Sequence, residues 1–204
     1  MTSLRHNGDE KPDPRDLYLD AARACILDVG WRRTTLTEVA RRSGVTRMTI
    51  YRTWSDMPQL LSDLMTREWG GVVADALAEA EADPDPDIAT VERLVGDIVG
   101  TVRRLRDNEL FVRIVDLDPE LILPYLFSRR GRSQDGILEL TVAALREAQA
   151  AGEVRAGHPV VMARSMLLAA HGFVLSAHTM VDDDVSLDDL DDELTLALTR
   201  SLQP

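Results

Sequence analysis

The side chains best suited to recognise another molecule lie close together in residues 46–54. On an α-helix, which turns 100° per residue, Ile50 and Trp54 share one face and are expected to point into a core. The opposite face then carries a different set of residues: Arg47, Met48, Thr49, Tyr51 and Arg52. An ordinary solvated face favours Glu and Lys, so this outward set indicates a binding surface.

The chemistry of these side chains fits double-stranded DNA. Arginine can pair bidentately with O6 and N7 of guanine, and the methyl groups of methionine or threonine can contact the thymine methyl group. The hydroxyl groups of Thr49 and Tyr51 suit phosphate oxygens. Free backbone N–H groups at the start of a helix over Thr35–Thr37 offer a further seat for a phosphate.

Two short helices and a tight turn must position this face. Thr35 and Glu38 have the spacing of a capping box, in which the hydroxyl and the carboxylate close the first turn reciprocally. The first short helix ends before Gly44, where the chain needs positive φ, and Thr46 caps the next helix. Residues 35–54 therefore predict a helix-turn-helix, which lays its second helix in the major groove. Two packed helices of an ordinary bundle are the alternative.

The distribution of charge favours the DNA-binding interpretation, although the net charge is −12. Residues 1–57 carry 10 Lys or Arg and 8 Asp or Glu, whereas residues 58–204 carry 13 and 27. Such an uneven distribution can place a local positive face on an acidic protein. Within residues 31–54 only Glu38 is acidic, against six arginines: Arg32, Arg33, Arg41, Arg42, Arg47 and Arg52.

The rest of the composition fits a globular, all-α chain of 204 residues, 45% hydrophobic and 28% charged. The single cysteine, Cys25, excludes a disulfide framework and a multi-cysteine zinc site. No apolar stretch is expected to reach the ~20 residues of a membrane span. We therefore expect a soluble, cytoplasmic protein with no membrane partner.

Three parts are expected along the chain. Residues 1–13 predict a flexible N-terminal arm, residues 14–57 a three-helix DNA-binding domain, and residues 58–204 a helical ligand-binding and dimerisation domain. A helix is expected from residue 58 to about 82, followed by a Pro-rich break at residues 83–87. Further helices are expected at 88–106, 108–116, 119–130, 133–151, 159–180 and 187–202.

Residues 14–61 resemble the N-terminal domain of TetR-family transcriptional regulators. The resemblance rests on Thr34–Ala40, Ser43–Thr46, Thr49–Trp54 and the pair Leu60-Leu61, all in register. It implies a homodimer that binds a palindromic operator, with a small-molecule effector pocket in the C-terminal domain. It also implies DNA contacts at Thr35, Thr37, Thr46, Arg47, Met48, Thr49, Tyr51 and Arg52.

Two positions depart from the family's pattern. The family often has a lysine at the position of Met57, where it contacts a phosphate at the start of a helix, and this contact is expected to be lost here. The family frequently has a glycine at the position of Met48. A bulky thioether there is expected to alter the base preference.

Two helices of the C-terminal part suit a dimer interface. Residues 159–180 are apolar almost all round, which predicts burial on both sides, and residues 187–202 carry a stripe of leucines. Two such helices per subunit fit a four-helix interface, which the resemblance also implies. The alternative is that both helices belong to the core of one chain.

An effector pocket is expected between the long helices, with apolar walls and a few polar groups. Its candidate lining residues are Met65, Trp69, Phe111, Ile114, Tyr125, Leu126, Met166, His171 and Phe173. Each of these is also compatible with plain core, and His171 with a satisfied core histidine. Arg103, Arg104 and Arg106 are expected to form a solvated face near a helix C-terminus.

We therefore expect a ligand-responsive DNA-binding regulator, a repressor released by a small, largely apolar effector. The alternatives are a helix-turn-helix adaptor that binds protein, or a helical enzyme. Catalysis has little support, because His171 and His178 lie two helical turns apart and no nucleophile elbow or phosphate-binding loop is present. No metal and no cofactor is expected. DNA binding, unlike protein binding, should weaken steeply and log-linearly with salt.

Overall fold

The computed structural model describes residues 13–82 and 90–204, and within these ranges it is entirely helical, with no strand. The expected arm before Asp13 and the expected break at residues 83–87 lie outside the described residues. Contacts between Cα atoms divide the chain into two compact units, the first ending at Leu64 and the second beginning at Met65. The division falls inside one continuous helix, α4 (Met57–Ala82).

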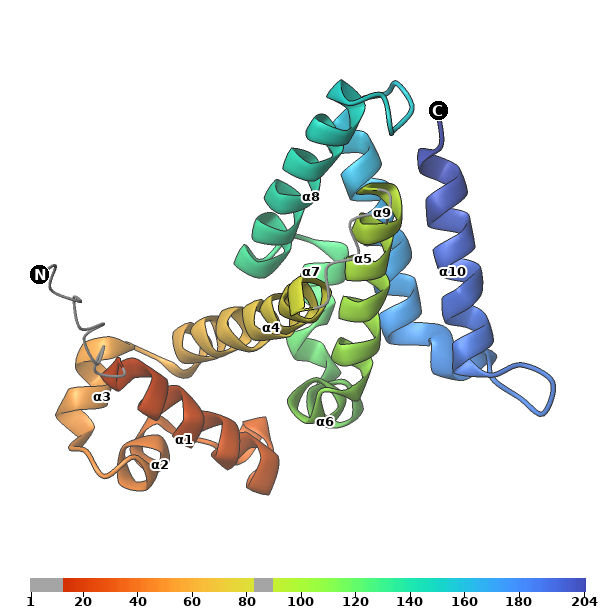
Figure 1. Cartoon of the computed structure of the whole chain (residues 1–204). Helices are drawn as coiled ribbons and strands as arrows, with labels where there is room; N and C mark the ends of the chain where they lie inside the picture. The colour runs from red at the N-terminus through yellow and green to blue at the C-terminus, as the bar shows by residue number, and fades with distance from the viewer. Residues whose placement is uncertain (1–12, 83–89) are drawn as a thin grey trace, which may run out of the picture. The chain divides into compact units, whose positions relative to one another are not determined.

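The first unit consists of α1 (Pro14–Val29), η1 (Trp31–Arg33), α2 (Leu36–Arg42), α3 (Arg47–Thr53) and the start of α4 (Figure 1). Local sequence signals set the ends of these helices. Asp13 caps α1 by accepting a hydrogen bond from the backbone N–H of Arg15, and Gly30 ends it with φ 81°. The Thr35 hydroxyl accepts from the N–H of Glu38 at 3.2 Å, as expected. The reciprocal half of that capping box is replaced, because both Glu38 oxygens accept from Arg41.

The turn between α2 and α3 follows the expected geometry. Gly44 has φ 70°, and the N–H of Val45 donates to the carbonyl oxygen of Ala40 at 3.0 Å. Thr46 caps α3 by accepting from the N–H of Thr49. A left-handed residue at this position reverses the direction of the chain, which brings α3 against α2.

The second unit has a continuous apolar core formed by five long helices. Their bounds are α5 (Thr90–Asp107), α6 (Glu109–Leu117), α8 (Arg132–Ala150), α9 (Pro159–Ser176) and α10 (Leu187–Leu202), and α9 is extended by η3 (Ala177–Met180). Figure 1 shows α5, α9 and α10 running alongside one another. The innermost residues include Val95, Leu145, Ala163 and Leu202, each no more than 1% exposed.

The expected continuous helix over residues 119–130 is wrong. The chain forms a 3₁₀ turn, η2 (Pro119–Leu121), and then a short helix, α7 (Leu123–Phe127). Pro124 explains the interruption, because proline lacks the N–H that would continue a helix and its ring clashes with the carbonyl four residues earlier. The helix therefore restarts with Pro124 in its first turn.

The expected solvated arginine face is also wrong for Arg106, whereas Arg103 keeps 47% of its side chain exposed. Arg106 and Arg103 both donate to Oδ2 of Asp191 on α10, at 2.6 and 2.8 Å. Each arginine lies more than 80 residues before Asp191 in the sequence. Asp191 is fully buried, and only 12% of the Arg106 side chain is exposed. Burial opposes ionisation of Asp191, but the hydrogen bonds from the two arginines outweigh it and lower its pKa. This cluster fastens α10 to α5.

Residues Pro159–Met180 are long and apolar enough to cross a membrane, with a mean hydropathy of 1.6, contrary to expectation. Core and interface helices of ordinary globular proteins meet the same criterion, so the composition alone carries no membrane assignment. Only 28% of this segment is buried within the chain, so the expected burial on both sides is not met by one chain alone. Val161 is 60% exposed and Leu168 is 71% exposed.

Candidate nucleic-acid interface

Helix α3 has a buried face and an exposed face, as the helical spacing predicts. Ile50 and Trp54 are 0% and 1% exposed and pack into the first unit. On the other side Met48 is 71% exposed and Tyr51 is 50% exposed. The remaining outward residues are exposed at Arg47 and Arg52 and half-buried at Thr49.

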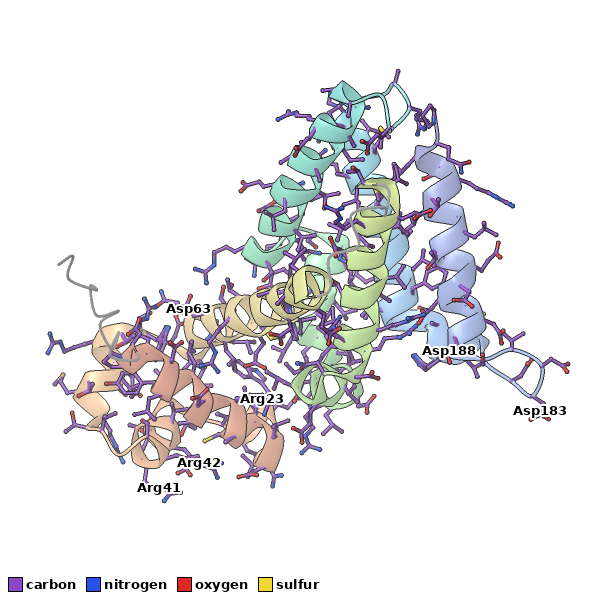
Figure 2. The ribbon with its side chains drawn as sticks, in the orientation of Figure 1. Arg23, Arg41, Arg42, Asp63, Asp183 and Asp188 are labelled. Atoms are coloured by element: carbon purple, nitrogen blue, oxygen red, sulfur yellow. The ribbon has the colours of Figure 1, made fainter. Side chains whose placement is uncertain are left out.

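The arginines of this region divide into two kinds. On α2, Arg41 pairs with Glu38 and Arg42 pairs with Asp28, both at 2.6 Å; Figure 2 labels the two arginines. The hydrogen bond from Arg41 lowers the pKa of Glu38, so that this carboxylate stays charged and neutralises its partner. On α3, Arg47 and Arg52 have no acidic partner among the residues that the structure describes. Positive charge is therefore left unneutralised on the outward face of α3.

The C-terminal end of α3 is held by a hydrogen bond from the buried Trp54. The indole Nε1–H of Trp54 donates to Oδ2 of Asp63 on α4 at 2.8 Å, and Arg15 of α1 donates to the same oxygen at 2.6 Å (Figure 2 labels Asp63). The Arg15 guanidinium lies 5.6 Å from the centre of the Trp54 ring, and Tyr18 meets that ring edge-on. Helices α1, α3 and α4 thus converge on one buried tryptophan.

The predicted threonines occupy the starts of the two short helices. Thr35 and Thr46 are exposed N-cap residues, and Thr37 lies half-buried in the first turn of α2. The hydroxyl groups of Thr46 and Thr49 lie 3.0 Å apart and form a hydrogen bond. The hydroxyl group of Thr35 likewise accepts a hydrogen bond from the first turn of its own helix. Thr35 and Thr46 therefore stabilise the starts of α2 and α3 as well as facing outward.

Four of the residues predicted for an effector pocket form two contact groups in the second unit. In one group, Trp69 of α4 meets Phe111 of α6 edge-on, with ring centres 5.5 Å apart. The other joins Tyr125 to His171 indirectly. The N–H of Gly131, beside the Tyr125 ring, donates to Oε1 of Gln134, whose Nε2 lies 3.1 Å from Nε2 of His171. Burial lowers the pKa of His171.

Two further pocket candidates lie elsewhere. Met166 and Phe173 line a groove of about 390 Å³ between α9 and α10, which Met65, Trp69, Phe111, Tyr125 and His171 do not line. Its other walls include Met162 and three residues of α10. Those three residues are Leu194, Leu198 and Leu202. The groove is thus part of the apolar surface that α9 and α10 leave open.

Three residues that organise these sites are not among the predicted site residues: Arg15, Asp63 and Gln134. The need of a buried Trp54 for a hydrogen-bond acceptor was a usable signal, since indole N–H groups are seldom left unpaired. Nothing local pointed to Gln134, because its partner His171 is 37 residues away. Among residues 13–82 and 90–204, no three His, Cys, Asp or Glu side chains are grouped to hold a metal ion.

The comparisons with known proteins agree with this geometry. Residues 19–64 match the family described as "Bacterial regulatory proteins, tetR family". An uncharacterized HTH-type transcriptional regulator of Mycobacterium tuberculosis, Rv2250c, is 36% identical over 194 residues, covering 95% of this chain and 97% of that protein. The chain belongs to the TetR family of transcriptional regulators. A second relative, the HTH-type transcriptional regulator AqdR of Rhodococcus erythropolis, is 38% identical over 98 residues, which cover 46% of this chain and 42% of that protein.

Solved structures show the same fold. A protein of unknown function from Rhodococcus sp. RHA1 has a TM-score of 0.69 at 19% identity and covers the whole of both chains. FadR of Bacillus subtilis, solved in complex with stearoyl-CoA, has a TM-score of 0.62 at 18% identity, covering 92% of this chain and 99% of its own. SmeT in complex with triclosan has a TM-score of 0.58 at 23% identity, over 91% and 89% of the two chains. The chain therefore shares its fold with these proteins.

Proposed function

We propose that this TetR-family regulator is a homodimeric repressor that binds a palindromic operator through α3 and is released by a small, largely apolar effector. The observation that carries the proposal is the outward face of α3. Arg47 and Arg52 lie there beside the exposed Met48 and Tyr51, and no acidic residue in 13–82 or 90–204 pairs with them. An arginine that binds a polyanion must be free to exchange its counterions for phosphates. Arg47 and Arg52 meet this condition among the described residues.

The proposed dimer is supported by the apolar surface of α9 and α10. Val161 in the wall of the groove, Leu168 of α9 and Leu196 of α10 are exposed to solvent. Monomeric soluble proteins seldom leave such contiguous apolar area open to water. A second copy that brings its own α9 and α10 would cover it as a four-helix interface and would place two recognition helices on successive major grooves, roughly 34–36 Å apart.

The proposed effector site is in the second unit, at Met65, Trp69, Phe111, Tyr125 and His171, whereas Met166 and Phe173 line the separate groove between α9 and α10. It is supported by the aromatic pair Trp69–Phe111 and by the polar chain from Tyr125 to His171. Two structural neighbours were solved with small-molecule ligands, stearoyl-CoA in one and triclosan in the other. An effector shifts binding only by its difference in affinity for the two states of the protein.

The DNA-binding proposal is tested with a duplex selected by the full chain from a random-sequence pool. Replacing Arg47 and Tyr51 together by alanine should weaken its binding at least tenfold, since each base or phosphate contact is worth about 1–3 kcal/mol. The matched control is Arg146→Ala, which removes an exposed arginine of α8 in the other unit and should leave affinity unchanged. Log affinity should also fall linearly with log salt concentration. Unchanged affinity of the double variant would remove α3 from the DNA interface.

The dimer is tested with a charge placed on the open face of α9. Leu168→Glu puts a carboxylate where the side chain is 71% exposed in one chain, so it should leave the fold intact and give a monomer by sedimentation velocity. The control is Leu140→Glu on α8, 58% exposed, which should sediment as the wild type does. A dimer that survives Leu168→Glu would place the interface elsewhere.

A further inference from the structure

We propose that Met48 recognises the 5-methyl group of a thymine in the major groove, so that it selects T over bases that lack this group. The inference rests on the proposed function, because it assigns a target to one residue of the same α3 face. It concerns base selection, whereas the proposed function concerns DNA binding as such.

The position of Met48 is the first observation. It is the second residue of α3, and its side chain is 71% exposed, while Ile50, two residues later, is fully buried. The N-terminal residues of a recognition helix are those that contact base edges. Tyr51 and Arg52 lie three and four residues further on, which places them beside Met48 on the same side of the helix. Met48 is thus at the centre of the outward face.

The chemistry of the side chain narrows its target. The major groove displays hydrogen-bond acceptors on guanine and adenine, donors on cytosine and adenine, and both an acceptor and a methyl group on thymine. Methionine has no donor and only a weak acceptor, so the thymine methyl group is the feature that it complements. Its unbranched, flexible chain can adjust to reach that group.

The neighbouring residues do not offer the same contact. The hydroxyl groups of Thr46 and Thr49 bond to each other, and Thr46 also caps the N–H of Thr49, which fixes both side chains. Arg47 and Arg52 are cations suited to guanine or phosphate. Of the two large apolar side chains on the outward face of α3, Met48 is the more exposed, at 71% against 50% for Tyr51, and the Tyr51 ring carries a hydroxyl group suited to phosphate.

The test removes a single methyl group from the DNA. In the duplex selected by the wild-type chain, each thymine is replaced in turn by uracil, in both half-sites, and the dissociation constant is measured. Burial of one methyl-sized group is worth about fourfold in affinity per half-site, or roughly 15-fold for two. We expect such a loss at one thymine of each half-site. Met48→Ala and Met48→Gln should bind the thymine and uracil duplexes equally, while Arg52→Ala should stay sensitive.

The outcomes separate this inference from the proposed function. Sensitivity to uracil at one position that disappears only in the Met48 variants supports it. If the wild-type chain binds the selected DNA but tolerates uracil at every position, the inference is overturned and the proposed function stands. The same holds if sensitivity to uracil persists in Met48→Ala. Failure to select any duplex overturns both. Thermal unfolding of each variant confirms that the substitution of so exposed a residue leaves the fold intact.

Discussion

Gly44 is where the backbone, rather than any side-chain contact, sets the geometry of the DNA-reading helix. It joins α2 to α3 with φ 70°, in the left-handed region that costs an L-amino acid roughly 1–2 kcal/mol. A Cβ atom built on Gly44 meets nothing within 4 Å. The cost of Gly44→Ala is therefore backbone strain alone, without a steric clash, and we expect the first unit to lose about 1–2 kcal/mol.

Native-state hydrogen exchange is the suitable assay, because it reports the stability of the first unit separately from the second. Amides of α2 and α3 should exchange roughly 5- to 30-fold faster in Gly44→Ala, the factor that corresponds to 1–2 kcal/mol. Gly44→Asn should recover part of the loss, since asparagine tolerates the left-handed region better than alanine. DNA affinity should follow the same order.

The matched control is the same substitution in a helix. Gly136 lies within α8, and a Cβ there also meets nothing within 4 Å. Gly136→Ala should therefore stabilise the second unit by about 0.5–1 kcal/mol, opposite in sign to Gly44→Ala. If Gly44→Ala exchanged as slowly as the wild type, or if alanine and asparagine were equivalent there, the argument from φ would be refuted.

Two further predictions follow from buried polar groups. Asp63→Ala deprives the Trp54 indole of its hydrogen-bond acceptor and should lower the free energy of unfolding, measured in urea, by about 2 kcal/mol. In a Trp54→Phe background the same substitution should cost less than about 1 kcal/mol. Equal costs in the two backgrounds would contradict the assigned hydrogen bond. Burial lowers the pKa of His171, so the unfolded chain takes up the proton first and stability should fall as the pH drops below about 6.5. His171→Gln should flatten that part of the Tm–pH profile, whereas the exposed His178→Gln should not, and identical profiles for the wild type and His171→Gln would exclude the effect.

The helix-turn-helix was predictable because its signals are local. Thr35, Gly44 and Thr46 act on neighbours within five residues along the chain, and the alternation of Ile50 and Trp54 with outward polar residues follows from the helical period alone. The expected capping box at α2 formed only in part, since Arg41, one turn further on, offers Glu38 a charged partner. At α10 the reciprocal box does form, between Ser186 and Asp189.

The second unit was less predictable because its polar contacts join distant segments. Composition placed Arg103 and Arg106 on a solvated helix face, and only the approach of α10 brings Asp191 to them. The apolar character of α9 was plain from the sequence. Its exposure was not, because an all-apolar helix looks the same whether its partners come from its own chain or from a second copy.

By itself the sequence determined the helical class, the starts and turns of the DNA-reading unit and the residues on each face of α3. These depend on capping, on φ and on a period of 3.6 residues, which act over a few residues. The tertiary structure decided which charges remain available. It neutralised Arg41 and Arg42, left Arg47 and Arg52 without an acidic partner among the described residues, and gave Trp54 its carboxylate partner. Such outcomes depend on which helices approach one another, and a linear pattern carries no record of that.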